Sequence, residues 1–159
     1  MDIALDAVRF ISVIAAAIVA GGQIFCLRAV LPAMPGWPAA MSARVHQDAL
    51  TVRPHTYLRL ASLVMLLSGL ALLILRYRSH APMAAIGWTL VALLISGISG
   101  MISSREWPIN DEINSWGAHP KIERYAELRA LWDSRHVKRT WLSLAALACF
   151  VISLILEVP

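Results

Sequence analysis

The chain has little charge. Of its 159 residues only 15% are Asp, Glu, Lys or Arg, against about 25% in a typical soluble domain. By contrast, 58% are hydrophobic, and the mean hydropathy is +0.65. This balance argues against an ordinary soluble domain and indicates an integral membrane protein.

Several motifs are missing, and each absence excludes a class of protein. Cys26 and Cys149, the two cysteines, lie in apolar runs and form no CxxC or CxxCH, which argues against a dithiol oxidoreductase and against c-type haem attachment. No HxxxH or HxxHH occurs, so the histidine boxes of membrane di-iron oxygenases are absent. The net charge of +4 forms no basic stripe with interleaved aromatics, so we expect no nucleic acid partner and assign the basic loops to anionic lipid.

Four segments are long and apolar enough to cross a bilayer, which needs about 20 residues per helix. They cover about residues 4–30, 54–75, 81–102 and 140–156. Because backbone hydrogen bonds must close within each segment in lipid, the spans are helices. Small residues recur at a spacing of four, as at Ala92, Ser96 and Gly100, which favours close helix packing. The sequence therefore predicts an all-α, integral membrane four-helix bundle in a single domain, 1–159.

Four spans place both termini and the short link 76–80 on one side of the membrane. The longer links, 31–53 and 103–139, then lie on the other side. Of the 14 Lys and Arg residues, Arg9, Arg76 and Arg78 flank the first side and the remainder flank the second. The positive-inside rule predicts that the long links are cytoplasmic and the termini outside, in a bacterial inner membrane. The expected partners are the lipid bilayer and a hydrophobic small molecule, and a homo-oligomer is left open.

An amphipathic juxtamembrane segment, about 108–139, carries the most suggestive polar residues. Arg129, Trp132, Asp133, His136 and Arg139 share one helical face. Asp133 precedes His136 by three residues, so we expect its carboxylate to orient the imidazole. The alternative is a solvated, salt-bridged helix surface, since a polar stripe near the bilayer is costly unless it faces the bundle interior or water.

The long links supply further candidates. His46, Arg53, His55 and Tyr57 lie in or next to the first link, where the arginine could reach lipid headgroups or hold an anionic or phenolic substrate. The stretch EWPINDEINSWG, residues 106–117, predicts a short helix that opens at Pro108 and ends at Gly117. Asn110 in this helix suits either a tie between helices or a donor to a developing oxyanion. Five of the six Trp residues, Trp107 and Trp132 among them, fall on the long-link side, as an interfacial belt or as the wall of a pocket.

Three stretches resemble the anthrone oxygenase-like family of small four-span membrane proteins, long catalogued as a domain of unknown function. They are GGQIF at 21–25, PIN at 108–110 and RALWDSRHVKRT at 129–140. Some fungal relatives oxidise anthrones to anthraquinones with molecular oxygen and no dedicated cofactor. The resemblance implies that Asn110, Trp132, His136 and Arg139 matter.

The resemblance leads to the hypothesis of a membrane monooxygenase for a hydrophobic phenolic, anthrone-like or quinol-like substrate. His136, paired with Asp133, would be the base, and Asn110 or Arg139 would hold the oxyanion. Trp132 and Trp107 would sandwich the rings. The remaining residues expected to bind substrate are His46, Arg53 and Tyr57. No cofactor is predicted.

Two alternatives stay open. In one, a metal ion or haem is bound by His46, His55 and His136 together with a nearby acid. In the other, the protein is a non-catalytic accessory or assembly subunit, whose small-residue helix faces serve packing alone.

Overall fold

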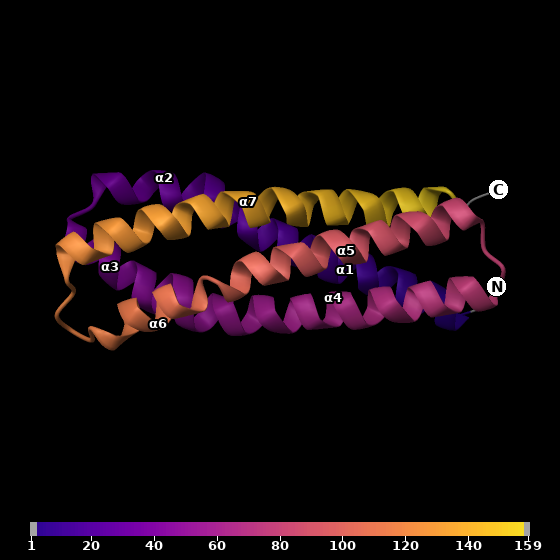
Figure 1. The fold of residues 1–159 in the computed structure, drawn as a ribbon, viewed down its shortest axis with the longest axis horizontal. Helices are drawn as coiled ribbons and strands as arrows, with labels where there is room; N and C mark the ends of the chain where they lie inside the picture. Colours follow the sequence, from indigo (N-terminus) through magenta and orange to yellow (C-terminus); the bar gives the residue numbers. More distant parts are fainter. Residues whose placement is uncertain (1–2, 158–159) are drawn as a thin grey trace.

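The computed structural model describes residues 3–157, with the side chains of residues 51–55 outside the description. Four long helices run lengthwise through the molecule, α1 (Ile3–Phe25), α4 (Arg53–Arg78), α5 (Met83–Ser104) and α7 (Ile122–Ile155) (Figure 1). Each belongs to a segment long and apolar enough to cross a membrane. The predicted all-α bundle of four membrane helices is therefore confirmed.

The chain connects α1 to α4 through a series of short helical pieces. These are a π-helical turn η1 (Cys26–Val30), α2 (Leu31–Ala33), the 3₁₀ turn η2 (Met34–Gly36), α3 (Ala39–Val45) and a second π-helical segment η3 (His46–Val52). The first long link, expected from sequence as a connection, is thus almost wholly helical. Pro35 and Pro38 lie where the direction of the chain changes, as residues that cannot continue a helix should.

The second long link contains the predicted short helix, α6 (Trp107–Ser115), with Pro108 in its first turn. Gly117 follows with φ of 56°, a left-handed conformation that glycine adopts without strain, and it ends the helix as expected. Helix α7 then starts at Ile122, far ahead of its apolar part, which agrees with the helical period seen before the fourth span.

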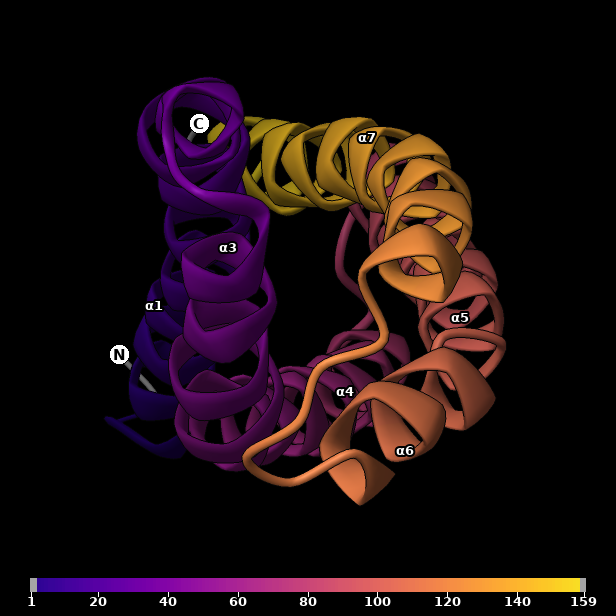
Figure 2. The same ribbon diagram turned by 90° about the vertical axis from the view of Figure 1, so that its left-hand side faces the viewer.

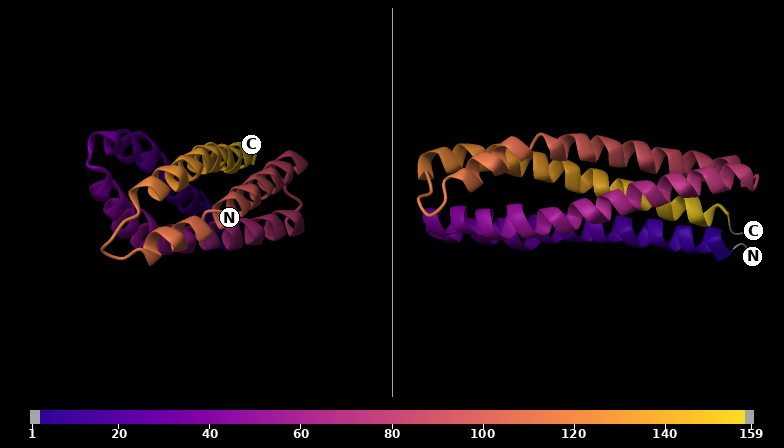
Figure 3. Two further views of the ribbon diagram at one scale, coloured as in Figure 1. Left: turned by 60° about the vertical axis from the view of Figure 1, so that its left-hand side comes forward. Right: turned by 90° about the horizontal axis from the view of Figure 1, so that it is seen from below.

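Viewed end-on, the four long helices follow one another around a ring in the order α1, α4, α5 and α7 (Figure 2). Small buried residues allow this approach, among them Ala15, Ala16 and Ala92, which surround the ring of Phe150. Both termini lie at one end, and α3 and α6 lie at the other (Figure 3). The two long links therefore meet at a single end of the bundle, as the four-span order requires.

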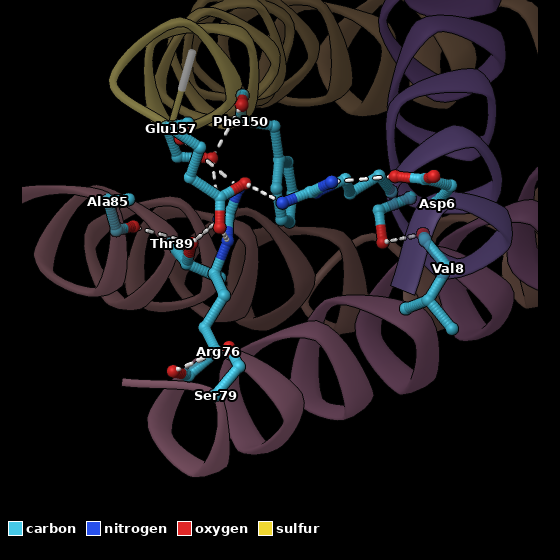
Figure 4. A network of polar contacts seen from close by, with 11 residues as sticks. Asp6, Val8, Arg76, Ser79, Ala85, Thr89, Phe150 and Glu157 are labelled. Atoms are coloured by element: carbon cyan, nitrogen blue, oxygen red, sulfur yellow. Dashed lines mark hydrogen bonds and ion pairs between the residues drawn. The ribbon is translucent and has the colours of Figure 1, made fainter. Parts of the chain in front are cut away.

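The terminal end is held by a buried ion network (Figure 4). Arg76 of α4 is fully buried and donates to both carboxylate oxygens of Glu157, at 2.9 and 2.7 Å. It also donates to Thr89 of α5 and to Ser153 of α7. Arg9 of α1 reaches the same Glu157 carboxylate at 2.8 Å. Arg9 also pairs with Asp6, so two cations meet two carboxylates, and ion pairs and hydrogen bonds together connect all four long helices.

Candidate functional site

The candidate site lies at the opposite end, where the two long links fold over the bundle. Both π-helical segments are there, and π-helical turns are rare features that occur often at functional sites. Cys26 and Val30 of η1, and Ala49 and Leu50 of η3, line one common cavity. The chain therefore departs from regular α-helix on both sides of that cavity.

Four aromatic rings pack against one another at this end. The indole of Trp132 lies parallel to the imidazole of His136, with centroids 4.8 Å apart and planes at 6°. His46, from η3, meets the same indole edge-on at 4.9 Å, and Tyr125 meets His46 at 5.8 Å. All four side chains are buried. The structure thus brings the predicted residues Trp132, His136 and His46 together.

Both nitrogens of His136 are engaged. Nε2 lies 3.1 Å from the carbonyl oxygen of Gln23, which requires a proton on Nε2. Nδ1 then accepts from Arg139, at 3.2 Å from Nε and 2.8 Å from Nη2. A cation that donates to Nδ1 opposes protonation there, so this geometry does not suit His136 as a general base.

The expected pairing of Asp133 with His136 is wrong. Asp133 points to the preceding turn and pairs with Arg129, four residues earlier, at 3.5 Å. Arg129 and His136 both lie one helical turn from Asp133. The charged guanidinium of Arg129 attracts the carboxylate more strongly than the neutral imidazole of His136 does. Arg139, rather than Asp133, orients the imidazole.

Arg139 is the centre of the polar contacts. Besides His136, its guanidinium pairs with Glu106 at 2.9 Å, and its Nη1 lies 3.4 Å from the hydroxyl of Ser103. The arginine side chain is 11% exposed and that of Glu106 is 1% exposed. Removing both charges from water has a desolvation cost that can exceed their mutual attraction. This buried ion pair is therefore weak evidence for a purely stabilising role.

Asn110, expected either as a tie between helices or as a donor to a developing oxyanion, lies on α6 and is not among the residues that line the two cavities described below. Its side chain is buried close to His46 of η3, and its Oδ1 has no hydrogen-bond partner among the described residues. Burial lowers the pKa of His46 to about 4, and the nearby Asn110 side chain partly offsets this shift. His46 is therefore neutral at physiological pH.

Several buried polar atoms in this region lack a hydrogen-bond partner among the described residues. They are Nε2 of His46, Oδ1 of Asn110, Nε1 of Trp132 and Oε1 of Glu106, whereas Oε2 of Glu106 has only its ion pair with Arg139. Such groups are rare in folded proteins because each costs about 1–3 kcal/mol when unsatisfied. Their concentration at one end indicates a place that holds water or a polar part of a ligand.

Two cavities adjoin this cluster. One, of about 340 Å³, is lined by Trp132, His136 and apolar residues of α1, η1 and η3. The other, of about 470 Å³, lies between α4 and α5 and includes Trp107 and Arg59. Leu50, Leu58 and Arg139 line both, so these three side chains separate the two spaces. Both volumes fall in the range of small-molecule sites, roughly 300–1,000 Å³.

A smaller space of about 60 Å³ continues from the larger cavity into the bundle, and hydroxyl groups line it. Ser99 and Ser143 lie 3.3 Å apart, and Ser143 donates to the side-chain oxygen of Gln23 at 3.2 Å. The cavity end of the bundle is therefore polar to some depth, whereas Phe150 and its apolar neighbours fill the middle.

Other predicted residues are placed apart from this cluster. Trp107 is 45% exposed, with the Arg59 guanidinium 4.1 Å above its ring. It lines the larger cavity and Trp132 the smaller one, so the two indoles do not line one common cavity, and the sandwich of one ring between them stays a prediction. Tyr57 is 60% exposed and lines an apolar groove between α1 and α4. The side chains of Arg53 and His55 lie outside the described residues.

The metal alternative gains nothing from the described part of the chain. No group of three or more His, Cys, Asp and Glu side chains there is close enough to hold a metal ion. His46 and His136 each pack against the Trp132 ring, with centroids at 4.9 and 4.8 Å.

Sequence reasoning missed two members of the site. The sequence marks Glu106 only as the first residue of the EWPINDEINSWG stretch, and Gln23 only as part of the GGQIF stretch. Glu106 lies just before α6, and no local sequence pattern indicates that it is buried, because its partner Arg139 is distant in the chain. Gln23 could have been found as the one amide within an apolar span, where a polar side chain requires a partner.

No family model matches the chain, and neither a curated protein nor a solved structure matches it. The resemblance to the anthrone oxygenase-like family therefore remains a prediction. The structure shows a small all-helical protein with four long apolar helices, and one end of the bundle is polar and contains cavities.

Proposed function

We propose that the protein is a membrane-bound oxygenase for a hydrophobic phenolic, anthrone-like or quinol-like molecule, whose oxygen is held by Arg139. The observation that carries the proposal is the position of this guanidinium, which is largely buried and lines both cavities. An arginine in such a place is a preorganised donor for an oxygen that gains negative charge.

The shape of the site supports a flat, apolar ligand. Leu50, Leu58 and Trp132 line the smaller cavity together with Arg139, and Phe25 and Trp37 line it too. Rings of the ligand would lie against these side chains, and its oxygen would meet the Arg139 cation between the two cavities.

The proposed reaction converts a methylene between two aryl rings into a carbonyl. Loss of a proton from the substrate gives an enolate, which reduces molecular oxygen. One oxygen atom enters the product and the other leaves as water, so anthrone and O₂ give anthraquinone and H₂O. The chain's part is to hold the enolate oxygen at Arg139 and to exclude bulk water with the leucines.

A second candidate function is a non-catalytic accessory subunit. The observation in its favour is that Arg139 already donates to His136 and pairs with Glu106, so these three side chains have partners within the protein. In that case the cluster would fix the positions of α1, α5 and α7, and the chain would have no turnover of its own.

Oxygen uptake with anthrone separates the two. The protein is placed in lipid nanodiscs, and uptake is compared with empty nanodiscs to subtract autoxidation. We expect turnover by the wild type and a loss of about 100-fold or more in Arg139→Gln, as for removal of an oxyanion donor. Glu112→Gln, an exposed change on α6, is the matched control and should retain activity. Uptake by the wild type equal to that of empty nanodiscs would contradict the oxygenase and leave the accessory role.

A further inference from the structure

Glu106 is held in an unusual way. Its side chain is 1% exposed, and its Oε2 lies 2.9 Å from Nη1 of Arg139. Beyond this ion pair, neither carboxylate oxygen has a hydrogen-bond partner among the described residues. A buried carboxylate normally needs several donors to remain charged. The negative charge of Glu106 therefore depends on Arg139.

Among the side chains that the structure describes, few other charges lie near Glu106. From α7, Arg139 and Arg135 face it, and from η1 the Cys26 thiol is near enough to interact. Arg135 donates to the carbonyl of Arg105 and is only partly buried, so solvent screens its charge. Arg139 is thus the cation that decides whether Glu106 is ionised.

Arg139 is also the group that a ligand oxygen would meet, because its side chain lines both cavities. An anionic oxygen on the guanidinium would compete with Glu106 for the same positive charge. Two buried anions on one cation leave an uncompensated negative charge, which is strongly unfavourable. Binding of an anion must therefore be accompanied by protonation of Glu106.

We propose that Glu106 is the proton acceptor for an acidic hydroxyl group that binds at Arg139. This inference rests on the proposed phenolic ligand and identifies the base that His136 cannot supply. The O–H bond of the ligand breaks, its proton forms an O–H bond on Glu106, and the phenolate takes the place of the carboxylate beside Arg139. Charge balances, because one ion pair replaces another and no proton enters or leaves the site.

The test uses 1,8-dihydroxyanthraquinone, whose ionisation is visible in its absorption spectrum, with wild-type protein in nanodiscs under argon. The pH is set below the ionisation range of the probe in solution. We expect the bound probe to show the ionised band. We also expect its binding enthalpy to be the same in buffers of different ionisation enthalpy, since the proton stays in the site.

Glu106→Gln keeps Arg139 but removes the acceptor. The ionised band should persist in this variant, and a single proton per bound probe should now be released to the buffer. Glu112→Gln is the same substitution at an exposed position of α6, and it should behave as the wild type.

Three results would overturn the inference: no binding of the probe, a neutral spectrum of the bound probe, or proton release already in the wild type. The wild-type spectrum and proton count decide the matter even if Glu106→Gln fails to fold. Because the probe is not oxidised and oxygen is absent, the oxygenase proposal is tested separately. An ionised probe on a protein without oxygen uptake would sustain the role of Glu106 and reject the oxygenase.

Discussion

At the scale of single residues, the long-link end of the bundle contains buried polar side chains that have few hydrogen-bond or ion-pair partners. His46 is the clearest case, since its ring is buried against Trp132 and Tyr125, and its Nε2 has no partner among the described residues. Such a ring can be accommodated only in its neutral form. The Glu106 carboxylate is buried as well, but it differs from His46 because the Arg139 cation lies beside it and stabilises its charged form.

A dependence of stability on pH follows for His46. Burial lowers its folded-state pKa to about 4, whereas an unfolded histidine titrates near 6.5. The unfolded chain therefore binds the proton first as the pH falls, and the stabilisation present above about 6.5 is lost towards about 4, by roughly 3 kcal/mol. Melting temperatures in detergent across this window should fall for the wild type and fall less for His46→Gln. Equal slopes for the two proteins would contradict a buried, neutral His46.

Residue patterns in the sequence located part of this arrangement. The run RALWDSRHVKRT carried Trp132, His136 and Arg139, because helical spacing alone places them on one face. Helical spacing does not distinguish between His136, three residues after Asp133, and Arg129, four residues before it. The sequence therefore predicts that Asp133 contacts His136, whereas the structure pairs Asp133 with Arg129. The partnership of Glu106 with Arg139 depends on how α5, α6 and α7 meet, which no local pattern contains.

At the scale of the helices, close packing depends on a few small residues. Gly69 of α4 faces α5 and α7, and a Cβ placed there would lie 2.8 Å from Cδ2 of Leu93 and 3.0 Å from Cζ of Phe150. Because Phe150 is fully buried, its ring has little room to move.

Gly69→Ala should therefore destabilise the bundle by about 1–3 kcal/mol through overpacking. Gly97 of α5 is the matched control, since a Cβ there meets nothing within 4 Å. Gly97→Ala should leave stability unchanged or raise it by up to about 1 kcal/mol, the difference in helix propensity. Thermal unfolding of both variants in the same detergent checks this, and an equal effect at the two positions would refute the packing described for Gly69.

The terminal ends of the helices depend on Arg76. Replacing it by Gln leaves Glu157 buried with Arg9 as its remaining cation. We expect a loss of about 3–5 kcal/mol, the usual result of removing one partner of a buried pair. Arg78→Gln, an exposed change two residues later, should cost little. A small effect of Arg76→Gln in thermal unfolding would show that the network in Figure 4 does not hold this end together.

At the scale of the whole molecule, the two ends have different characters. One end carries the termini and a closed ion network, and the other carries the cavities and the long links. Hydropathy was enough to predict the four long helices and their order, because long uncharged apolar segments are a strong signal in a membrane protein. The cavities were not, since their walls come from η1, η3, α4 and α7 together.

The orientation in the membrane is a further prediction at this scale. With the long links in the cytoplasm, Ser79→Cys in the short hairpin should react with an impermeant maleimide in intact cells, and Ala118→Cys beyond α6 should react only after lysis. Both positions are exposed, whereas native Cys26 and Cys149 are buried and provide a low background. Labelling of Ala118→Cys in intact cells would reverse the proposed orientation.

The central claim is that the long-link end binds a hydrophobic phenol through Arg139. The most direct test is the dissociation constant of 1,8-dihydroxyanthraquinone for nanodisc-embedded wild type, Arg139→Gln and Arg135→Gln. Loss of a charged hydrogen bond of about 1.5–3 kcal/mol predicts weakening by roughly 10- to 150-fold in Arg139→Gln. Arg135→Gln, which removes a nearby cation that lines neither cavity, should bind as the wild type does. Equal affinity of the wild type and Arg139→Gln would contradict the account.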